Sequence, residues 1–414
     1  MSGLIKVAVI GGGASGMMAS CIAARNGADV TLYERGNICG VKLNITGKGR
    51  CNITNNCDLN TLISNTVKNG RFLYSAFSAF DSQSAIAFFE DCGVRLKTER
   101  GNRVFPVSDS AKEVSGALRT AMHRLGVKII NKRVISVCEE NGVVCGVKAE
   151  NGAFQPFDRV IIATGGMSYP RTGSTGDGYR MARAMGHTVT ELSPSLVPLV
   201  IKGSIPKRLE GLALKNVGLT VTSGNKTIYT DFGEMVFTSN GVSGPMILSA
   251  SAHMGRKTDF PYEIVIDLKP ALTQDVLDKR VLSDFDDAKN RDFANSLGKL
   301  LPSKIIPVII ELSGIPADKK VNSITAEERG RLCGLVKGLR LQAVSFGSMD
   351  EAVVTSGGIT VKEINPKTME SKLIRGLYFC GEVIDVNAYT GGFNLQIAWS
   401  TGYCAGTYAA GKEV

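Results

Sequence analysis

The sequence predicts an α/β protein with a discontinuous Rossmann-like domain, an inserted β-rich domain and a small helical domain. Two observations predict this fold class. A glycine-rich loop at residues 11–16 lies between an apolar strand and a small-residue helix. From residue 353 the chain returns to the strand and helix patterns of its first 190 residues, after a stretch of different character. An insertion within a discontinuous nucleotide-binding domain explains this order best.

The glycine loop follows a strand at residues 5–10 and opens a helix at residues 17–25. Gly11, Gly13 and Gly16 have the G-x-G-x-x-G spacing. In this motif the first glycine permits a tight turn, the second lets the backbone approach a pyrophosphate, and the third allows close helix–strand packing. A second strand at residues 30–33 ends in Glu34, where a carboxylate accepts hydrogen bonds from a ribose. The context therefore predicts a dinucleotide site.

The rest of the first 190 residues alternates between helical and extended patterns. Residues 158–166 form an apolar strand that ends in a turn of small residues, as expected of a core strand whose end touches the cofactor. Helices are expected over about 61–80 and 82–92, and extended segments over 129–138, 142–149 and 154–157.

The pattern changes near residue 194 to short strands with Gly and Pro turns, including 217–222 and 226–230. A polar helical stretch follows, and the end of the chain carries a strand at 376–380 and a helix at about 395–410. We therefore predict three domains: a nucleotide-binding domain over 1–190 and 353–414, a β-rich substrate domain over 191–272 and 336–352, and a helical domain over 273–335.

The composition of the 414 residues is that of a globular protein, with 43% hydrophobic and 21% charged residues. No apolar run is long enough to cross a bilayer and no signal peptide is expected, so we predict a cytoplasmic protein without membrane insertion. Ten cysteines without a C-x-x-C pair, and only three histidines, predict no metal site. The net charge of +10 is spread along the chain, which favours a solvated surface and an anionic cofactor over a nucleic-acid partner.

The C-terminal segment indicates which dinucleotide is bound. Only one G-x-G-x-x-G motif is present, which leaves a flavin or a nicotinamide. Gly381 and Glu382 end a strand, and residues 391–394 open a helix. A helix N-terminus near the pyrimidine end of the flavin ring stabilises negative charge on the reduced ring, which a nicotinamide does not require. The sequence therefore predicts FAD.

Several segments resemble the YhiN/BaiN-like family of FAD-dependent oxidoreductases, a group that includes aminoacetone-oxidase-like flavoproteins. Residues 40–55 match the signature G-x-K-x-x-x-[ST]-G-x-G-R-C-N-x-T-N, and the resemblance extends over nearly the whole chain. It implies a FAD domain, an inserted β-rich domain and a small helical domain. Some members reduce a conjugated double bond of a 3-oxo-steroid, and others resemble amine oxidases. The further matching segments are 103–106, 163–178, 233–245 and 368–396.

Lys42 and Arg50 lie where they would reach the phosphates or the adenosine, and Asn52, with Asn44, either bonds the flavin ring edge or caps a turn. We interpret Cys51 as a packing residue rather than a redox thiol. Glu382 and Asp385 flank a strand end where ribityl hydroxyls bind. The full set of expected FAD contacts comprises Gly11, Gly13, Ala14, Ser15, Gly16, Glu34, Arg35, Lys42, Gly47, Arg50, Cys51, Asn52, Val134, Ala163, Thr164, Gly165, Gly381, Glu382, Asp385, Gly392, Phe393, Asn394 and Leu395.

Three residues are candidates for contact with substrate. Tyr169 follows the strand end at 163–166, and Tyr389 precedes Gly391. A phenol donates a proton to a carbon or an enolate, and Arg171 could polarise a carbonyl or hold a carboxylate. The structural alternative for each tyrosine is amphipathic packing.

These residues lead to three functional hypotheses. The first is hydride transfer through flavin N5, with NAD(P)H as the transient donor, to the conjugated C=C of a hydrophobic enone of the 3-oxo-steroid or bile-acid type. The second is an amine oxidase that produces hydrogen peroxide. The third, ranked last, is a nucleic-acid-associated flavoprotein, because the helical stretch at 273–335 has only two aromatic residues among its charges.

Overall fold

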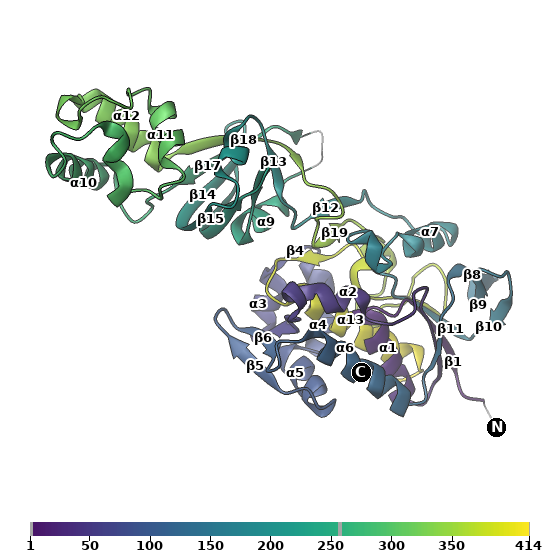
Figure 1. The fold of residues 1–414 in the computed structure, drawn as a ribbon. Coiled ribbons are helices and arrows are strands. Elements are labelled where there is room, and N and C mark those ends of the chain that lie inside the picture. Colours follow the sequence, from purple (N-terminus) through teal and green to yellow (C-terminus); the bar gives the residue numbers. More distant parts are fainter. Residues whose placement is uncertain (1–2, 256–258, 414) are drawn as a thin grey trace. The chain divides into compact units, whose positions relative to one another are not determined.

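The computed structural model describes residues 3–255 and 259–413, which divide into two compact units (Figure 1). The first unit combines the chain up to Ser195 with the chain from Met349 onward, and the second spans Leu196–Ser348. The predicted fold class is confirmed, with a discontinuous Rossmann-like unit and an inserted β-rich region. The three-domain boundaries stay a prediction.

A parallel sheet in the order β20-β11-β1-β2-β7 forms the centre of the first unit. Its middle strands, β11, β1 and β2, are buried along most of their length, which accounts for their apolar sequences. The strands are β1 (Lys6–Ile10), β2 (Asp29–Tyr33), β7 (Lys128–Ile130), β11 (Arg159–Ile162) and β20 (Leu377–Phe379).

Two helices, α1 (Ala14–Arg25) and α13 (Phe393–Ala409), pack against each other beside this sheet. Glycines make their close approach possible. A Cβ atom on Gly406 would lie 2.5 Å from the backbone oxygen of Ala19, and one on Gly402 would lie 2.7 Å from that of Ser15. Because these two positions are glycines, α13, near the end of the chain, can pack directly against the backbone of α1, near its start.

Shorter elements surround the sheet. An antiparallel sheet has the order β3-β6-β5, a second has the order β10-β9-β8, and the pairs β21-β4 and β12-β19 complete the unit. The strands are β3 (Thr54–Asn55), β4 (Thr66–Lys68), β5 (Leu96–Glu99), β6 (Arg103–Pro106), β8 (Val134–Glu140), β9 (Val143–Ala149), β10 (Phe154–Pro156), β12 (Ser193–Ser195), β19 (Val354–Ser356) and β21 (Asn387–Ala388). The helices are α2 (Val41–Ile45), α3 (Leu59–Ser64), α4 (Tyr74–Ala79), α5 (Ser82–Asp91), α6 (Ala111–Arg124) and α7 (Asp177–Ala184).

The expectation of a continuous helix over 61–80 is wrong. Strand β4 separates α3 from α4 because Thr66 and Lys68 pair with β21. Asn69 then adopts a left-handed backbone, and its side chain donates to the backbone oxygen of Asp385. The helix expected at 82–92 is confirmed as α5, whose N-terminus is capped by Asp81. Helix α6 was not predicted.

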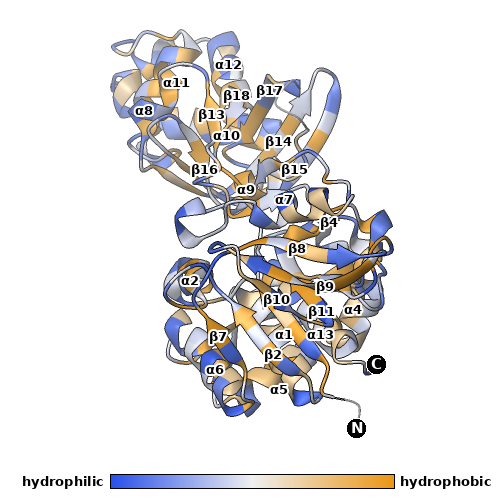
Figure 2. Cartoon of the chain, turned by 90° about the vertical axis from the view of Figure 1, so that its right-hand side faces the viewer, coloured by the Kyte–Doolittle hydropathy of each residue, from blue (hydrophilic) through white to orange (hydrophobic). Residues whose placement is uncertain are grey.

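The second unit contains a closed antiparallel barrel in the order β13-β16-β15-β14-β17-β18. The strands expected at 217–222 and 226–230 are longer than predicted, because barrel closure extends their pairing. The expected polar stretch is helical and includes the apolar helix α11 (Figure 2). The elements are β13 (Leu199–Ile201), β14 (Ala213–Ser223), β15 (Lys226–Phe237), β16 (Gly241–Ser243), β17 (Tyr262–Asp267), β18 (Leu339–Phe346), α8 (Ile205–Leu209), α9 (Pro245–Ser251), α10 (Gln274–Asp286), α11 (Ile306–Ser313) and α12 (Ala326–Lys337).

Within residues 3–255 and 259–413, no helix has the length and apolar character needed to cross a membrane. In the same ranges, no group of three or more His, Cys, Asp or Glu side chains is arranged to hold a metal ion.

The α1–α13 contact predicts that Gly406→Ala destabilises the protein. The added methyl group must displace backbone of α1, which costs about 1–3 kcal/mol. Gly330 is the matched control, because it also lies within a helix but a Cβ there would meet nothing within 4 Å among the described residues. Gly330→Ala should leave the free energy of unfolding equal or raise it by up to about 1 kcal/mol. Equal free energies for the two variants in urea unfolding would contradict the account.

Candidate functional site

The candidate site lies at the carboxyl ends of the parallel strands. Strand β1 lies between β2 and β11 in the sheet. The connection from β1 leads to β2 on one side, and the neighbour on the other side, β11, comes from a later part of the chain, so the chain connections run in opposite directions from this point. Such a switch point opens a crevice in which α/β proteins bind ligands. Turns with left-handed glycines follow three of the strands: Gly11 after β1, Gly165 after β11 and Gly381 after β20.

The glycine loop has the geometry expected from its sequence. Gly11 has a φ of 107°, and a Cβ there would lie 2.6 Å from the backbone oxygen of Ala163. A Cβ on Gly16 would lie 1.9 Å from the backbone oxygen of Gly11, so the helix packs too closely for any side chain. These two glycines are required by the fold itself.

Gly13 is different, because no contact with the described residues requires it to be glycine. Its φ is −78°, and a Cβ there would meet no described atom within 4 Å, chain neighbours aside. It is the N-cap of α1, and no side chain of the described residues caps that helix end. The open space and free N–H groups fit a pyrophosphate.

Glu34 lies beside this loop. Its carboxylate accepts hydrogen bonds from the backbone N–H of Gly12, at 2.8 Å, and of Gly36, at 2.7 Å. These bonds hold the carboxylate at the end of β2, where a ribose would bind. Its neighbour Arg35 bonds Thr175 at 2.5 Å and lies 3.7 Å from Asp177.

Lys42 and Glu382, both expected to contact cofactor, pair with each other at 2.7 Å. Glu382 also accepts from the Ser168 hydroxyl at 2.9 Å and the Thr355 N–H at 2.8 Å, while Lys42 also donates to Ser168. Burial raises the pKa of Glu382, but the Lys42 charge and these hydrogen bonds outweigh burial and hold that pKa below its ordinary value. The glutamate is therefore ionised at neutral pH. Ser168 and Thr355 were not among the predicted residues.

The segment from Thr46 to Cys51 has an unusual backbone. Gly47, Lys48, Gly49 and Cys51 all have positive φ, and neither Lys48 nor Cys51 is a residue type that favours it. Strain of this kind persists where the surrounding structure enforces it and is frequent at functional sites. The segment is the signature block of the sequence resemblance.

Arg50, in this segment, is held by protein groups. It pairs with Glu99 and with Asp109, whose carboxylate lies 2.9 Å from its Nε atom, and its guanidinium lies 4.2 Å from the centre of the Phe105 ring. These bonds raise the pKa of Arg50 and lower the pKa of Glu99. The pKa of Asp109 is lowered first by a hydrogen bond from Lys97, at 2.8 Å, and then by Arg50. The charge of Arg50 is thus matched by carboxylates at the protein surface.

Cys51 and Asn52 follow Arg50. The Cys51 thiol is fully buried, and burial raises its pKa to about 12, so it is neutral at pH 7 and suited to packing. The Asn52 Oδ1 atom and the Thr164 hydroxyl are buried without a partner among the described residues. Because orphaned buried polar atoms are costly, these two fit a bound group that supplies partners. Asn44, in contrast, accepts from Ser115 at 2.7 Å.

The N-terminus of α13 completes the site. Gly391 and Gly392 have φ values of 116° and 101°, and a Cβ on Gly392 would lie 2.3 Å from the Thr54 backbone. Asn394 uses its side chain to close the preceding loop, since it bonds the backbone of Ala388 and Tyr389. The helix end has no side-chain cap within the part of the chain that the structure describes.

Other predicted contacts lie around these segments. A Cβ on Gly381 would lie 2.4 Å from the Ser15 hydroxyl. Asp385 forms an ion pair with Lys68 at 2.8 Å. Phe393 is buried within the core, and Leu395 is partly buried on α13.

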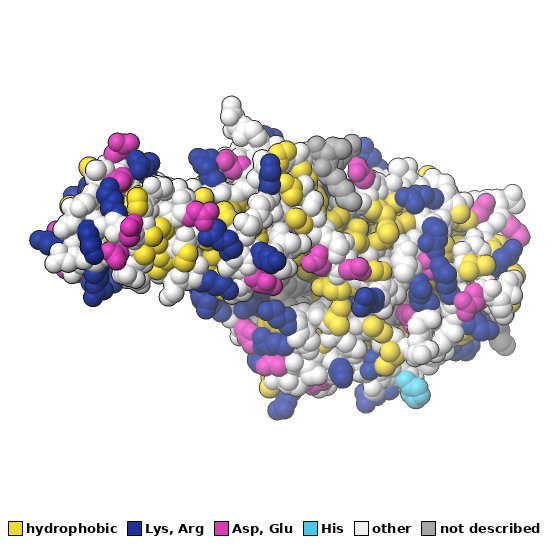
Figure 3. All heavy atoms as spheres, turned by 45° about the horizontal axis from the view of Figure 1, so that its top comes forward, with side chains coloured by type: hydrophobic (Ala, Val, Ile, Leu, Met, Phe, Trp, Pro, Cys, Tyr) yellow, Lys and Arg dark blue, Asp and Glu magenta, His cyan; other side chains and the backbone are white. Residues whose placement is uncertain are grey.

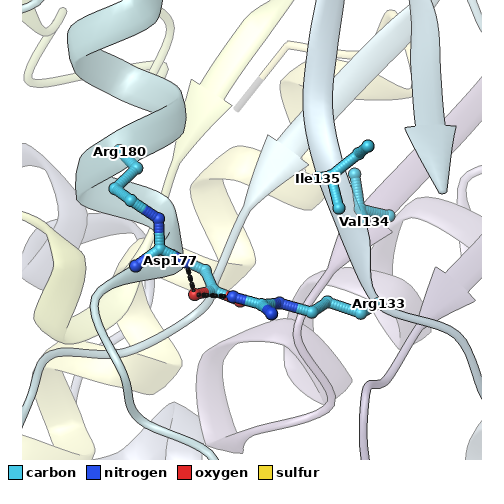
Figure 4. A pocket seen from close by; sticks show the side chains of 5 residues that line it. All are labelled: Arg133, Val134, Ile135, Asp177 and Arg180. Atoms are coloured by element: carbon cyan, nitrogen blue, oxygen red, sulfur yellow. Dashed lines mark hydrogen bonds and ion pairs between the residues drawn. The ribbon is translucent and has the colours of Figure 1, made fainter. Parts of the chain in front are cut away.

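Val134 lines a cavity of about 220 Å³ between β8 and α7 (Figure 4). Asp177 bonds Arg133 there at 2.7 and 2.8 Å and also bonds Arg180. Burial raises the pKa of Asp177, but the arginines outweigh it, so that the pKa is lowered. Ile135 completes the lining. Asp177 also lies 3.7 Å from Arg35, the residue that follows Glu34.

The substrate candidates stay predictions. Tyr169 is partly buried and has a φ of 52°, next to Ser168 of the ion-pair cluster. The Tyr389 backbone N–H donates to the Asn65 oxygen, which holds this residue just before Gly391. Arg171 is exposed.

Comparisons with known proteins identify relatives over the full length. A model of the HI0933-like protein Rossmann domain matches residues 5–408. A 3-dehydro-bile acid delta(4,6)-reductase of Clostridium scindens is 31% identical, with 98% of this chain and 99% of the relative covered. A ribosomal RNA dihydrouridine synthase of Escherichia coli is 30% identical, with 98% of each covered. The family resemblance predicted from sequence is confirmed.

Solved structures agree on the fold. An open flavocytochrome c3 fumarate reductase superposes with a TM-score of 0.53 and 18% identity, covering 99% of this chain and 78% of that chain. A 3-ketosteroid delta1-dehydrogenase of Sterolibacterium denitrificans gives 0.54 and 14%, covering 98% and 99%. At these identities the likeness concerns the fold alone, which is a Rossmann-like FAD-binding fold.

Gly13→Ala separates ligand contacts from fold contacts. The methyl group should weaken FAD binding by at least about tenfold, because it occupies the space expected for the pyrophosphate. The unfolding free energy of the flavin-free protein should change by less than about 0.5 kcal/mol. Gly298→Ala serves as the control, since a Cβ there also meets nothing within 4 Å in the described residues. A Gly13→Ala variant that binds FAD as tightly as the control would contradict the assignment.

Proposed function

Because the chain belongs to the HI0933-like Rossmann family and is an FAD-dependent oxidoreductase, we propose that it reduces a carbon–carbon double bond conjugated to a carbonyl. NAD(P)H is the proposed electron donor. The first proposed substrate class is a hydrophobic enone of the 3-oxo-steroid or bile-acid type, which is supported by the name of the Clostridium relative.

The free N-terminus of α13 is the observation that carries this proposal. FAD, when bound, would supply the hydride. Gly391 and Gly392 leave the first N–H groups of a 17-residue helix open toward the cofactor segments, and a helix N-terminus favours negative charge. Asn52 lies in the signature segment with an unpaired acceptor. Together these groups suit a ring that gains negative charge on reduction.

The proposed reaction also requires groups on the substrate side. Addition of hydride to the β-carbon of an enone places negative charge on the carbonyl oxygen, and a proton must reach the α-carbon. Arg171 is proposed to stabilise the oxygen. Tyr389 is the first proposed proton donor because its backbone is fixed next to Gly391, and Tyr169 is the second.

A uracil base in RNA is a second candidate substrate, since its C5=C6 bond is also conjugated to a carbonyl. Two proteins related to this chain, one from Escherichia coli and one from Haemophilus influenzae, are named ribosomal RNA dihydrouridine synthases. A specific observation favours it: residues 42–133 contain 15 Lys and Arg but only seven Asp and Glu. Residues 273–335, the helical stretch considered for nucleic-acid binding from its sequence, contain ten Lys and Arg and ten Asp and Glu. Residues 42–133 therefore carry a net charge of +8 (15 − 7), whereas residues 273–335 are neutral (10 − 10).

The proposal is tested by mixing NAD(P)H-reduced protein, without oxygen, with a 3-oxo-Δ4-steroid or a uridine-containing RNA oligomer. We expect the oxidised flavin spectrum to return with one of them and the product to gain two hydrogens. Tyr389→Phe should slow this step by about 10²–10⁴-fold and leave flavin reduction by NAD(P)H intact. Tyr169→Phe is the parallel variant.

Two results would contradict these assignments. Reoxidation only by oxygen, with hydrogen peroxide formed in proportion to a consumed amine, would establish the amine oxidase alternative instead. Wild-type reoxidation rates in both tyrosine variants would exclude both phenols as proton donors, and another group or solvent would then have to deliver the proton.

A further inference from the structure

Two exposed cationic segments are bonded to the chain that leads into α13. The first is the β5–β6 hairpin, which carries Arg100 in its turn and Arg103 at the start of β6. The Asn55 side-chain amide donates to the backbone oxygen of Gly101 in this turn, at 3.0 Å, and to that of Gly391, at 3.1 Å. One amide group therefore joins the hairpin turn to the glycines before α13.

The second segment follows β4 and carries Arg71 and Tyr74. It is attached to the same part of the chain, because β4 pairs with β21 and the Tyr389 N–H donates to Asn65. Arg71 is exposed, and 56% of the Tyr74 surface is exposed, which is high for an aromatic side chain. The two cationic segments are thus each connected to residues 387–391 by separate hydrogen bonds.

The guanidinium groups of these segments lack acidic partners. Among the residues that the structure describes, Arg71, Arg100 and Arg103 form no ion pair, and the Arg103 Nε atom donates only to the Arg100 backbone oxygen, at 3.0 Å. The helices α10–α12 show the opposite arrangement. Their basic and acidic side chains are interspersed on the surface (Figure 3) and pair with each other, as in Arg280–Asp284 and Arg329–Asp278. Between α10 and α11, Lys299 pairs with Asp287.

We propose that Arg71, Tyr74, Arg100 and Arg103, here called the arginine rim, dock the backbone of single-stranded RNA, an inference that rests on the second candidate substrate of the proposed function. Three guanidinium groups without a carboxylate partner among the described residues, on two separate segments, suit a chain of phosphates, whereas a steroid carboxylate needs only one bidentate arginine. The Arg103 guanidinium also lies 5.9 Å from the centre of the Phe105 ring, a contact that leaves its charge unmatched. Tyr74 offers an exposed ring on which a base stacks. Both segments are attached beside the N-terminus of α13, so a bound strand would lie next to the flavin site.

The test measures binding of a fluorescein-labelled uridine oligomer to the FAD-loaded protein by anisotropy. Arg100→Ala/Arg103→Ala should lower affinity at least tenfold and reduce the slope of log affinity against log salt by about 1.4, the value for two lost phosphate contacts. Tyr74→Ala should lower affinity by about 5–150-fold through lost stacking. Lys279→Ala/Lys289→Ala is the control, since it removes the same charge from exposed positions on the helical part.

The same preparations are assayed for reoxidation by a 3-oxo-Δ4-steroid, which keeps the outcomes separate. Equal loss of RNA binding in the control variant would show only an effect of net charge and would overturn the rim. Absence of RNA binding in the wild type, with steroid reduction intact, would overturn the rim but leave the proposed reaction standing. Weakened binding of a steroid carboxylate, with RNA binding unchanged, would assign the arginines to a small acid and also overturn the proposal.

Discussion

The ion pair between Lys42 and Glu382 is the interaction on which the rest of the site depends. The two residues are 340 positions apart in sequence, and Glu382 also accepts from Ser168 and from the Thr355 backbone. A single carboxylate therefore joins the signature segment, the turn after β11, strand β19 and the turn after β20. Because its pKa is lowered in the folded state, the pair stabilises the fold above the ordinary pKa of a glutamate and loses this contribution as pH falls.

Backbone proximity is the second constraint. Gly11, Gly16, Gly381 and Gly392 each lie where a Cβ would collide with another part of the first unit. Gly13 lies in open space, so its glycine is explained by a ligand rather than by the fold. The first four glycines are therefore needed to form the crevice, whereas Gly13 leaves space within it. This difference supports the binding of a dinucleotide independently of any related protein.

The local motifs were predictable from the sequence and the long-range pairings were not. The β1–loop–α1 unit, the strand ending at Glu34 and the helix after Gly392 follow from residue spacing. The break of the expected helix by β4 depends on pairing with β21, more than 300 residues later, which leaves no local signal. The ion pair of Lys42 with Glu382 could not be predicted for the same reason, since the two residues are far apart in sequence. Which charged side chains pair with each other also depends on the fold, so the sequence alone does not show that the arginines of the rim lack carboxylate partners.

A double-mutant cycle on FAD affinity tests the central claim most directly. Lys42→Met and Glu382→Gln should each weaken FAD binding by about 1–2 kcal/mol, because each leaves a largely buried partner without its counterpart. Lys42→Met/Glu382→Gln should then lose little more than either single variant, which gives a coupling of at least about 1 kcal/mol. Losses in the two single variants that simply add in the double variant would contradict the claim that this ion pair organises the site.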